Sequence, residues 1–223
     1  MHHEAAIRAG NLECSKKAIR RRRQHQQEEE EPIVSSSTRK YVNLDPWMMG
    51  SPSATIQSFH RHSATADICI IEGCMGLYDS KDGTSNDGST AQIAKLLGAP
   101  VLLVIDGSKM ARSVAAMALG YALYDEQVRL GGIVVNKVGG PVHVQWIREA
   151  IEKEGGAGGR LKDGGTGEPT MFAGALPNDT AASVPEWHLG LTMPSENNDV
   201  ERFIRLACLV KENLDLDSML KLG

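Results

Sequence analysis

The sequence predicts an α/β protein whose parallel sheet is covered by helices on both faces. Four short apolar runs are continuous rather than alternating, which is typical of strands that are buried on both sides. Segments with helical spacing of apolar residues separate these runs, as expected for strand–helix–strand crossovers. The hydrophobic content of 41% and the charged content of 23% fit a globular domain of this kind.

Each predicted strand stops at a residue that can serve a site. The four runs are Asp67–Ile71, Pro100–Ile105, Gly132–Val135 and Met171–Leu176. They are followed by Glu72, by Asp106, by Asn136 with Lys137, and by Pro177. Because ligands bind outside the carboxyl ends of the strands in open α/β sheets, these residues mark the edge where a site is expected. Cys69 lies inside the first run, which predicts a buried thiol.

Four apolar stripes predict the helices. They are Ile93, Leu96 and Leu97; Met110, Val114, Met117 and Tyr121; Val144, Ile147 and Ile151; and Val200, Phe203, Ile204 and Ala207. Ser89 or Thr90 is the expected N-cap of the first helix. We interpret the methionine stripe as a face that packs on the sheet.

Composition separates a charged tail from the rest of the chain. Arg20–Arg23 is basic and Glu28–Glu31 is acidic, and such blocks cannot form a core. We expect a disordered tail over residues 1–40 and a folded domain over residues 41–223. Gly155–Gly167 holds seven glycines among thirteen residues. It runs from a helix toward a strand, whereas a phosphate loop runs from a strand into a helix, so we expect a flexible insertion over residues 155–170.

Charge and composition argue against several classes of protein. A net charge of −4 gives no reason to expect a nucleic-acid partner. No apolar run reaches the ~18 residues that a membrane span needs, so no membrane partner is expected. The four cysteines show no CxxC spacing, which fits a reducing compartment. The N-terminus lacks a secretory apolar region, so we expect a cytoplasmic protein, with an organelle left open.

The segment from Glu72 to Asp79 is the most informative indication of a site. A predicted strand ends on Glu72, and a glycine-bearing loop leads to a second carboxylate at Asp79. Gly88, Ser89 and Thr90 then open a helix whose free N–H groups and hydroxyls suit an anionic ligand. Turn formation by Asp79 and simple N-capping by Ser89 are the alternative interpretations.

Several short pieces occur in a fixed order along the chain. They are Asn43–Gly50, Glu72–Asp79, Gly88–Ala91, Leu96–Pro100, Met110–Ser113, Asn136–Gly139 and Glu186–Leu191. As a set they strongly resemble the cobyrinic acid a,c-diamide synthase family, including its relative that acts on hydrogenobyrinic acid. The resemblance runs from about residue 41 to the C-terminus.

That resemblance implies a P-loop NTPase fold of the dethiobiotin-synthetase-like branch and an ATP-dependent synthetase chemistry. Family members use ATP with Mg²⁺ to activate two acetate carboxylates of a corrinoid, and ammonia then displaces the phosphate. The activation is needed because oxide is a poor leaving group, and the metal neutralises charge on the phosphates. The expected partners are a corrinoid or related tetrapyrrole, ammonia that is free or derived from glutamine, and a second copy of the chain in a homodimer.

The resemblance also implies roles for individual residues. Glu72 matches the magnesium-binding acid, and Asp79 matches a second acid that organises metal or substrate. Gly88, Ser89 and Thr90 are expected to bind substrate. Arg112 is expected to pair with a substrate carboxylate, with a surface ion pair as the alternative.

A second group of residues matches the part of the family that reads the adenine base. Asn136 and Lys137 resemble its base-reading pair, and an amide can both donate to and accept from the base. Leu176 and Pro177 are expected to form a backbone wall beside it. Asn136 as a turn former is the alternative interpretation.

The phosphate loop of the family, Gly-x-x-x-x-Gly-Lys-Ser/Thr, occurs nowhere in the chain. Residues 1–40 stand where the resemblance places it, so we expect the first unit of the sheet and the C-terminal amidotransferase domain to be missing. Three interpretations follow. The chain is a corrinoid amidoligase that is weakly active or inactive as it stands, a non-catalytic tetrapyrrole-binding or dimerising protein, or an amidoligase for another tetrapyrrole such as nickel-sirohydrochlorin.

Overall fold

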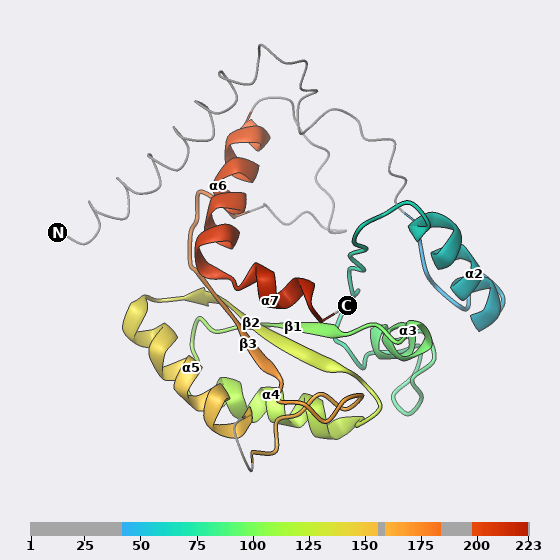
Figure 1. The fold of residues 1–223 in the computed structure, drawn as a ribbon, viewed down its shortest axis with the longest axis horizontal. Helices are drawn as coiled ribbons and strands as arrows, with labels where there is room; N and C mark the ends of the chain where they lie inside the picture. Colours follow the sequence, from blue (N-terminus) through green and yellow to red (C-terminus); the bar gives the residue numbers. More distant parts are fainter. Residues whose placement is uncertain (1–41, 156–158, 184–197, 223) are drawn as a thin grey trace.

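The computed structural model describes residues 42–155, 159–183 and 198–222 (Figure 1). Its elements are α2 (Pro52–Ser63), α3 (Thr90–Leu97), β1 (Val101–Asp106), α4 (Ser113–Tyr124), β2 (Leu130–Val138), α5 (Pro141–Gly155), β3 (Met171–Pro177), α6 (Asn198–Asn213) and α7 (Leu216–Leu220). The predicted tail at residues 1–40 and the Glu186–Leu191 piece lie outside the described residues. In the part of the chain that is described, no helix is long and apolar enough to cross a bilayer.

The three strands form a parallel sheet in the order β1-β2-β3, which confirms the predicted α/β class. Helices α4 and α5 cover one face of the sheet, and α6 and α7 lie on the other (Figure 1). β2 continues to Val138, so Asn136 and Lys137 lie inside the end of the strand rather than after it. In β1, Asp106 pairs in register with Asn136. The carboxyl ends of neighbouring strands therefore meet at one edge, as predicted.

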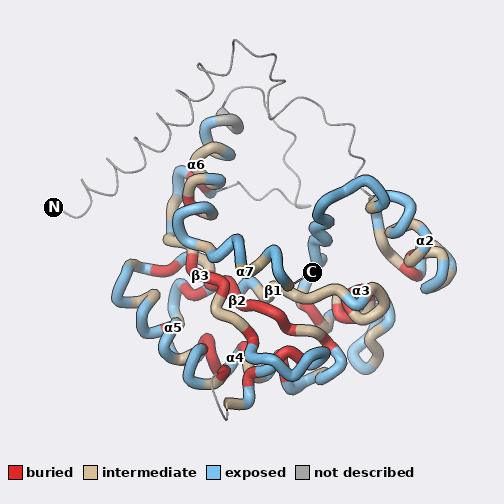
Figure 2. Tube along the Cα trace, viewed as in Figure 1, coloured by how far each residue is buried: buried red, intermediate tan, exposed pale blue. Residues whose placement is uncertain are grey.

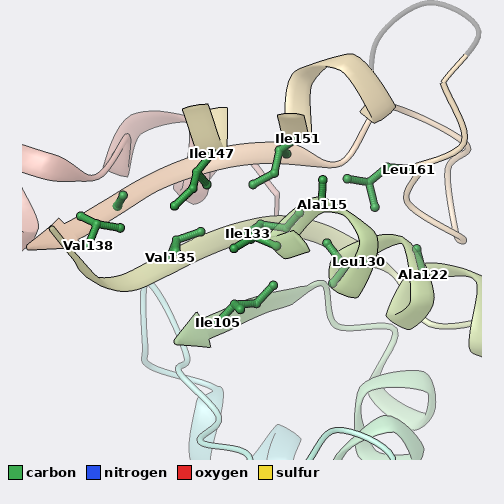
Figure 3. Packing of buried hydrophobic residues seen from close by; sticks show 13 residues of the cluster. Ile105, Ala115, Ala122, Leu130, Ile133, Val135, Val138, Ile147, Ile151 and Leu161 are labelled. Atoms are coloured by element: carbon green, nitrogen blue, oxygen red, sulfur yellow. The ribbon is translucent and has the colours of Figure 1, made fainter. Parts of the chain in front are cut away.

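The core lies between the sheet and the layer formed by α4 and α5 (Figure 3). Ile133 and Val135 project from the central strand β2, and Ile147 and Ile151 project from α5; all four side chains are fully buried. The predicted stripe on α5 is thereby confirmed. Burial is concentrated along the sheet and the inner sides of these helices, whereas their outer sides are exposed (Figure 2).

The predicted strand at Asp67–Ile71 is not formed. None of the described strands pairs with this segment, and Ile70 is 89% exposed. Cys69 is exposed as well, so the prediction of a buried thiol there is wrong. The reason is physical: a run of β-branched residues becomes a strand only when another strand satisfies its backbone groups, and no described strand does so here.

The glycine-rich insertion is not wholly a surface loop. Leu161 is fully buried and belongs to the main core, and Lys162 forms an antiparallel bridge with Pro169. The turn between them lies against the chain before β2. A Cβ on Gly164 would stand 2.1 Å from the carbonyl oxygen of Glu126. Glycine is required here because the two backbones approach so closely, and the prediction of a flexible surface insertion fails for this part.

The helices differ from the predicted stripes at several positions. α4 begins at Ser113, so Met110 precedes the helix, and Met117 is 41% exposed rather than packed on the sheet. On α6, Phe203 is 53% exposed. Helix α2 was not predicted, although Ser51 caps it and Pro52 follows at the first helical position, which is a recognisable start signal. Helix α7 was missed because it has only five residues.

Candidate functional site

The carboxyl edge of the sheet gathers polar groups from β1 and β2. The ammonium of Lys137 lies 2.8 Å from Oδ2 of Asp106, and the backbone N–H of Ser108 donates to Oδ1 of the same carboxylate. Gly107 N–H donates to the carbonyl oxygen of Asn136. These contacts tie the loop after β1 to the end of β2. The hydrogen bonds from Lys137 and then from Ser108 hold the pKa of the Asp106 carboxyl well below its ordinary value.

Lys137 adopts a left-handed backbone conformation, with φ of 59°. This conformation is uncommon for a residue with a side chain, and such strain tends to collect at functional positions. Its N–H donates to Oδ1 of Asn136, which stabilises the conformation. The amide nitrogen of Asn136 has no protein acceptor among the described residues. A donor therefore remains at the edge where the sequence predicts a base-reading residue.

The end of β3 adjoins this group. Pro177 pairs with Val138, and the N–H of Asn178 donates to the carbonyl oxygen of Val138. Leu176 and Pro177 are partly buried. The structure therefore brings Asn136, Lys137, Leu176 and Pro177 to one sheet edge, which is the arrangement that the sequence predicts for them.

Two residues flank the edge from the helical layer. Arg112 is exposed just before α4 and lines an open hollow of about 410 Å³ together with Trp146 of α5. His143 accepts a hydrogen bond at Nδ1 from the N–H of Gly139, and its Nε2 lies 2.5 Å from the carbonyl oxygen of Met110. His143 therefore links the loops that follow β1 and β2. Sequence reasoning missed it, although its place one turn after the Asn136–Gly139 piece was a usable signal.

The two acidic residues of the predicted site, Glu72 and Asp79, lie on the segment before α3. Glu72 is exposed, and Gly73 packs so closely on Thr90 that a Cβ would stand 2.9 Å from its methyl carbon. Oδ2 of Asp79 accepts the N–H of Gly76 at 2.8 Å, while the Asp79 N–H donates back to the Gly76 carbonyl. Asp79 thus closes a tight turn, which favours the turn-forming interpretation of this residue.

The backbone N–H groups at the start of α3 largely donate to acceptors within the protein. The fully buried Ser89 accepts the N–H of Gln92 and donates its own hydroxyl hydrogen to the Asn86 carbonyl. The side chain of Gln92 accepts the N–H of Gly88. The N–H of Ala91 donates to the carbonyl oxygen of Leu77. This geometry supports N-capping by Ser89 rather than the anion site predicted for Gly88, Ser89 and Thr90.

The structure places the two groups of predicted residues at opposite ends of α4. The hydroxyl of Tyr78 donates to the Tyr121 carbonyl in the last turn of the helix, and Asn86 contacts Asp125 directly after it. Arg112, in contrast, precedes the first turn. A helix of twelve residues is about 18 Å long. Arg112 and the loop that contains Tyr78 and Asp79 therefore cannot contact the same small group, and they can serve one reaction only through an extended ligand or through two ligands.

The donors present fit the cofactor that the sequence suggests. Mg²⁺ prefers oxygen ligands and is commonly held by one or two carboxylates together with the phosphates of a nucleotide. The Glu72 carboxylate is exposed and therefore open to a metal ion, and no group of three or more possible metal ligands occurs within the described ranges. The free amide nitrogen of Asn136 suits the edge of a base.

Comparison with known proteins gives a consistent result. The model of the AAA domain family matches residues 25–184. A cobyrinate a,c-diamide synthase of Dehalococcoides mccartyi (strain CBDB1) is 38% identical over 182 residues, covering 81% of this chain and 36% of that protein. The proteins of the same name from Archaeoglobus fulgidus, 36% identical over 81% of the chain and 36% of the relative, and from Listeria innocua, 32% identical over 82% and 38%, are also similar.

The chain spans little more than a third of the length of these curated relatives. No solved structure gives a significant match.

Proposed function

The chain belongs to the AAA domain family and groups there with the cobyrinate a,c-diamide synthases, and from this we propose that it serves the ATP-dependent amidation of corrinoid acetate carboxylates. The observation that carries the proposal is the 38% identity over 182 residues. The family match covers residues 25–184, so it includes both the Glu72–Asp79 loop and the carboxyl edge of the sheet.

The proposed chemistry has two steps. A carboxylate oxygen of the corrinoid attacks the γ-phosphorus of ATP, the bond to the bridging oxygen breaks, and an acyl phosphate and ADP form. Ammonia then adds to the acyl carbon, inorganic phosphate leaves with the original carboxylate oxygen, and loss of a proton gives the amide. Phosphorylation turns an oxide into a good leaving group, while Mg²⁺ neutralises charge during the transfer.

The residues contribute binding and orientation in this proposal. Glu72 would hold Mg²⁺ when the nucleotide is bound. Asp79 shapes the loop that follows Glu72. Asn136 reads the base, with Leu176 and Pro177 as the adjoining wall. The Asp106 carboxylate accepts a hydrogen bond from the Lys137 ammonium, and this contact positions Lys137 beside the base. Arg112, which is exposed, pairs with a carboxylate of the substrate.

The proposal is tested by following oxygen from substrate to phosphate. The complete chain is incubated with Mg-ATP, ammonium and cobyrinic acid whose carboxylates carry ¹⁸O. We expect one ¹⁸O to appear in inorganic phosphate for each amide formed, because the phosphate leaves with a substrate oxygen. Mass spectrometry of phosphate and corrinoid measures both products, and a full-length relative serves as the positive control.

A matched pair of variants assigns the metal ligand. We expect Glu72→Gln to lower product formation at least about 100-fold, since removal of a group that stabilises transferring charge has effects of this order. Glu201→Gln, the same change on an exposed position of α6, should leave the rate unchanged. Corrinoid binding without ADP formation would replace the proposal by a binding role. Turnover of nickel-sirohydrochlorin in place of cobyrinic acid would replace the substrate.

A further inference from the structure

His143 joins two loops that follow different strands. It is the third residue of α5, which begins at Pro141. Its Nδ1 accepts the N–H of Gly139 at 3.0 Å, in the turn after β2. Its Nε2 lies 2.5 Å from the carbonyl oxygen of Met110, in the loop after β1. The second contact spans 33 residues of sequence, so it ties the start of α5 to a distant segment of the chain.

The two contacts of His143 require one form of the imidazole ring. A backbone N–H can only donate and a carbonyl oxygen can only accept, so Nδ1 must be without a hydrogen and Nε2 must carry one. A ring with a hydrogen on each nitrogen could not accept from Gly139, and the other neutral tautomer would satisfy neither partner. The side chain is partly buried, where an unsatisfied backbone group is costly. The geometry therefore fixes both the orientation and the tautomer of the ring.

The turn before α5 is shaped to receive this ring. Gly140 has a φ of 149°, a conformation that favours glycine, and its carbonyl oxygen accepts the N–H of Val144 in the first turn of the helix. A side chain at the third helical position that reaches back to a backbone N–H before the helix resembles a capping box. Here an imidazole nitrogen takes the place of the usual carboxylate or amide oxygen.

Both partners of His143 lie close in sequence to residues of the proposed site. Gly139 comes three residues after Asn136, which is proposed to read the base. Met110 comes two residues before Arg112, which is proposed to pair with a carboxylate of the substrate. The side chain of Arg112 makes no capping hydrogen bond to α4, so the position of Arg112 depends on the loop that carries it.

We propose that His143 is a positioning residue that fixes Arg112 relative to Asn136. The inference rests on the proposed function, in which a nucleotide and a corrinoid bind at the same time. His143 acts through the backbone at Gly139 and Met110 rather than through a ligand. Its loss should therefore leave the binding of each ligand nearly intact and impair their alignment with one another. A displacement of about 1 Å caused far from the reacting atoms can lower a rate about 100-fold.

Two conservative substitutions separate the two contacts. The side-chain oxygen of asparagine lies near the position of Nδ1, so His143→Asn keeps an acceptor for Gly139 but does not reach Met110. The amide nitrogen of glutamine lies near the position of Nε2, so His143→Gln keeps a donor for Met110 but loses the acceptor. Because the contact with Met110 holds the loop of Arg112, the two variants should differ in rate.

Steady-state kinetics of amide formation by the complete chain measures this difference. We expect His143→Asn to lower kcat by about 10- to 100-fold while the KM for ATP stays within about twofold. We expect His143→Gln to retain most of the wild-type kcat. The matched control is His62→Asn on α2, an exposed histidine whose ring contacts the Ser58 carbonyl of its own helix, and its rate should not change. Far-UV circular dichroism establishes that each variant is folded.

NMR of the complete chain labelled with ¹⁵N-histidine tests the ring without catalysis. We expect a ring N–H on Nε2 that is protected from exchange with water and is absent in His143→Asn. A protected hydrogen on Nδ1, or no protected ring N–H, would overturn the inference. An active wild type with an equally active His143→Asn would overturn it as well and would leave the proposed function standing. A wild type that forms no amide would instead overturn the proposed function, and the role of His143 in that reaction with it.

Discussion

The carboxyl edge of the sheet and the segment from Asp67 to Thr90 were predicted with the same reasoning and turned out differently. At the edge, β1, β2 and β3 pair in parallel and bring Asp106 beside Asn136 and Lys137. In the segment, the expected strand is unpaired, and its isoleucines are exposed. Both regions contain runs of β-branched residues that end on polar groups. The difference is that only the first has neighbours that satisfy its backbone and cover its side chains.

The comparison shows what holds each region in place. The edge rests on a buried core, with Ile133 and Val135 of β2 fully buried beneath it. The segment is held by one small apolar cluster, in which Leu77 packs with Ala91 and Val128, and by contacts at the C-terminal end of α4: Tyr78 with Tyr121, and Asn86 with Asp125. We therefore expect large effects on stability from apolar substitutions in the sheet and smaller effects from polar substitutions in the segment.

The largest expected difference comes from one substitution made in both regions. Ile133→Ala removes a fully buried side chain from the central strand, and we expect it to lower the free energy of unfolding by about 2–5 kcal/mol. Ile70→Ala changes a side chain that is 89% exposed, so the expected change is within about 0.5 kcal/mol. Urea denaturation followed by circular dichroism measures both values.

Ile70→Ala is also the variant that can break the comparison. A loss close to that of Ile133→Ala would mean that the Asp67–Ile71 segment is covered in solution, and the strand predicted from the sequence would then be correct after all. Unequal slopes of the two transitions would have to be excluded first, since a changed slope indicates a change in the exposed surface rather than in stability alone.

Two carboxylates that pair with lysines sharpen the comparison. The Asp125 side chain is 15% exposed and lies 2.5 Å from the ammonium of Lys95, whereas Asp106 and Lys137 are about half exposed. We expect Asp125→Asn to lower the free energy of unfolding by about 1.5–3 kcal/mol, the range for hydrogen bonds to charged groups. Asp106→Asn should cost clearly less, since water screens exposed ion pairs.

The pH dependence of the free energy of unfolding is an independent test of the Asp125 ion pair. Burial raises the pKa of Asp125, but the hydrogen bonds from Lys95 and from the Gln127 N–H outweigh it and hold the pKa below its ordinary value. A lowered pKa stabilises the folded state above the unfolded pKa of about 3.9, and this stabilisation is lost as the pH falls through the lower folded value. The difference between wild type and Asp125→Asn should therefore shrink in acid. A constant difference down to pH 2 would contradict the ion pair.

The sequence was sufficient where a local pattern and its tertiary surroundings agree. Continuous apolar runs predicted β1, β2 and β3, and Ser89, one of the two expected N-caps, begins α3. It was insufficient where the outcome depends on a distant partner. The Asp67–Ile71 run carries the strand pattern but has no partner among the described strands, and Leu161 is buried by residues far from the glycine-rich run in which it occurs.

The candidate site divides in the same way. Strand ends and parallel pairing were enough to predict that Asn136, Lys137, Leu176 and Pro177 share an edge. The placement of the Tyr78–Asp79 loop at the far end of α4 was not predictable, because it depends on contacts with Tyr121 and Asp125 that no local pattern encodes.

The smallest expected effect tests the anchor of that loop. The Tyr78 hydroxyl donates to the Tyr121 carbonyl at 2.6 Å, so we expect Tyr78→Phe to lower the free energy of unfolding by about 0.5–1.5 kcal/mol. Tyr124→Phe is the matched control, because this side chain is 73% exposed and should show no change. Burial, and then the charge of Asp125, raises the pKa of Tyr78 to about 12.

The raised pKa means that this stabilisation is complete below the unfolded pKa of about 10 and is lost as the pH rises toward 12. Absorbance titration of the phenolates should therefore show an ionisation near pH 12 that is absent in Tyr78→Phe. If Tyr78→Phe left the high-pH end of the titration unchanged, the loop would not be docked on α4. The separation between the two groups of predicted site residues would then lose its main support.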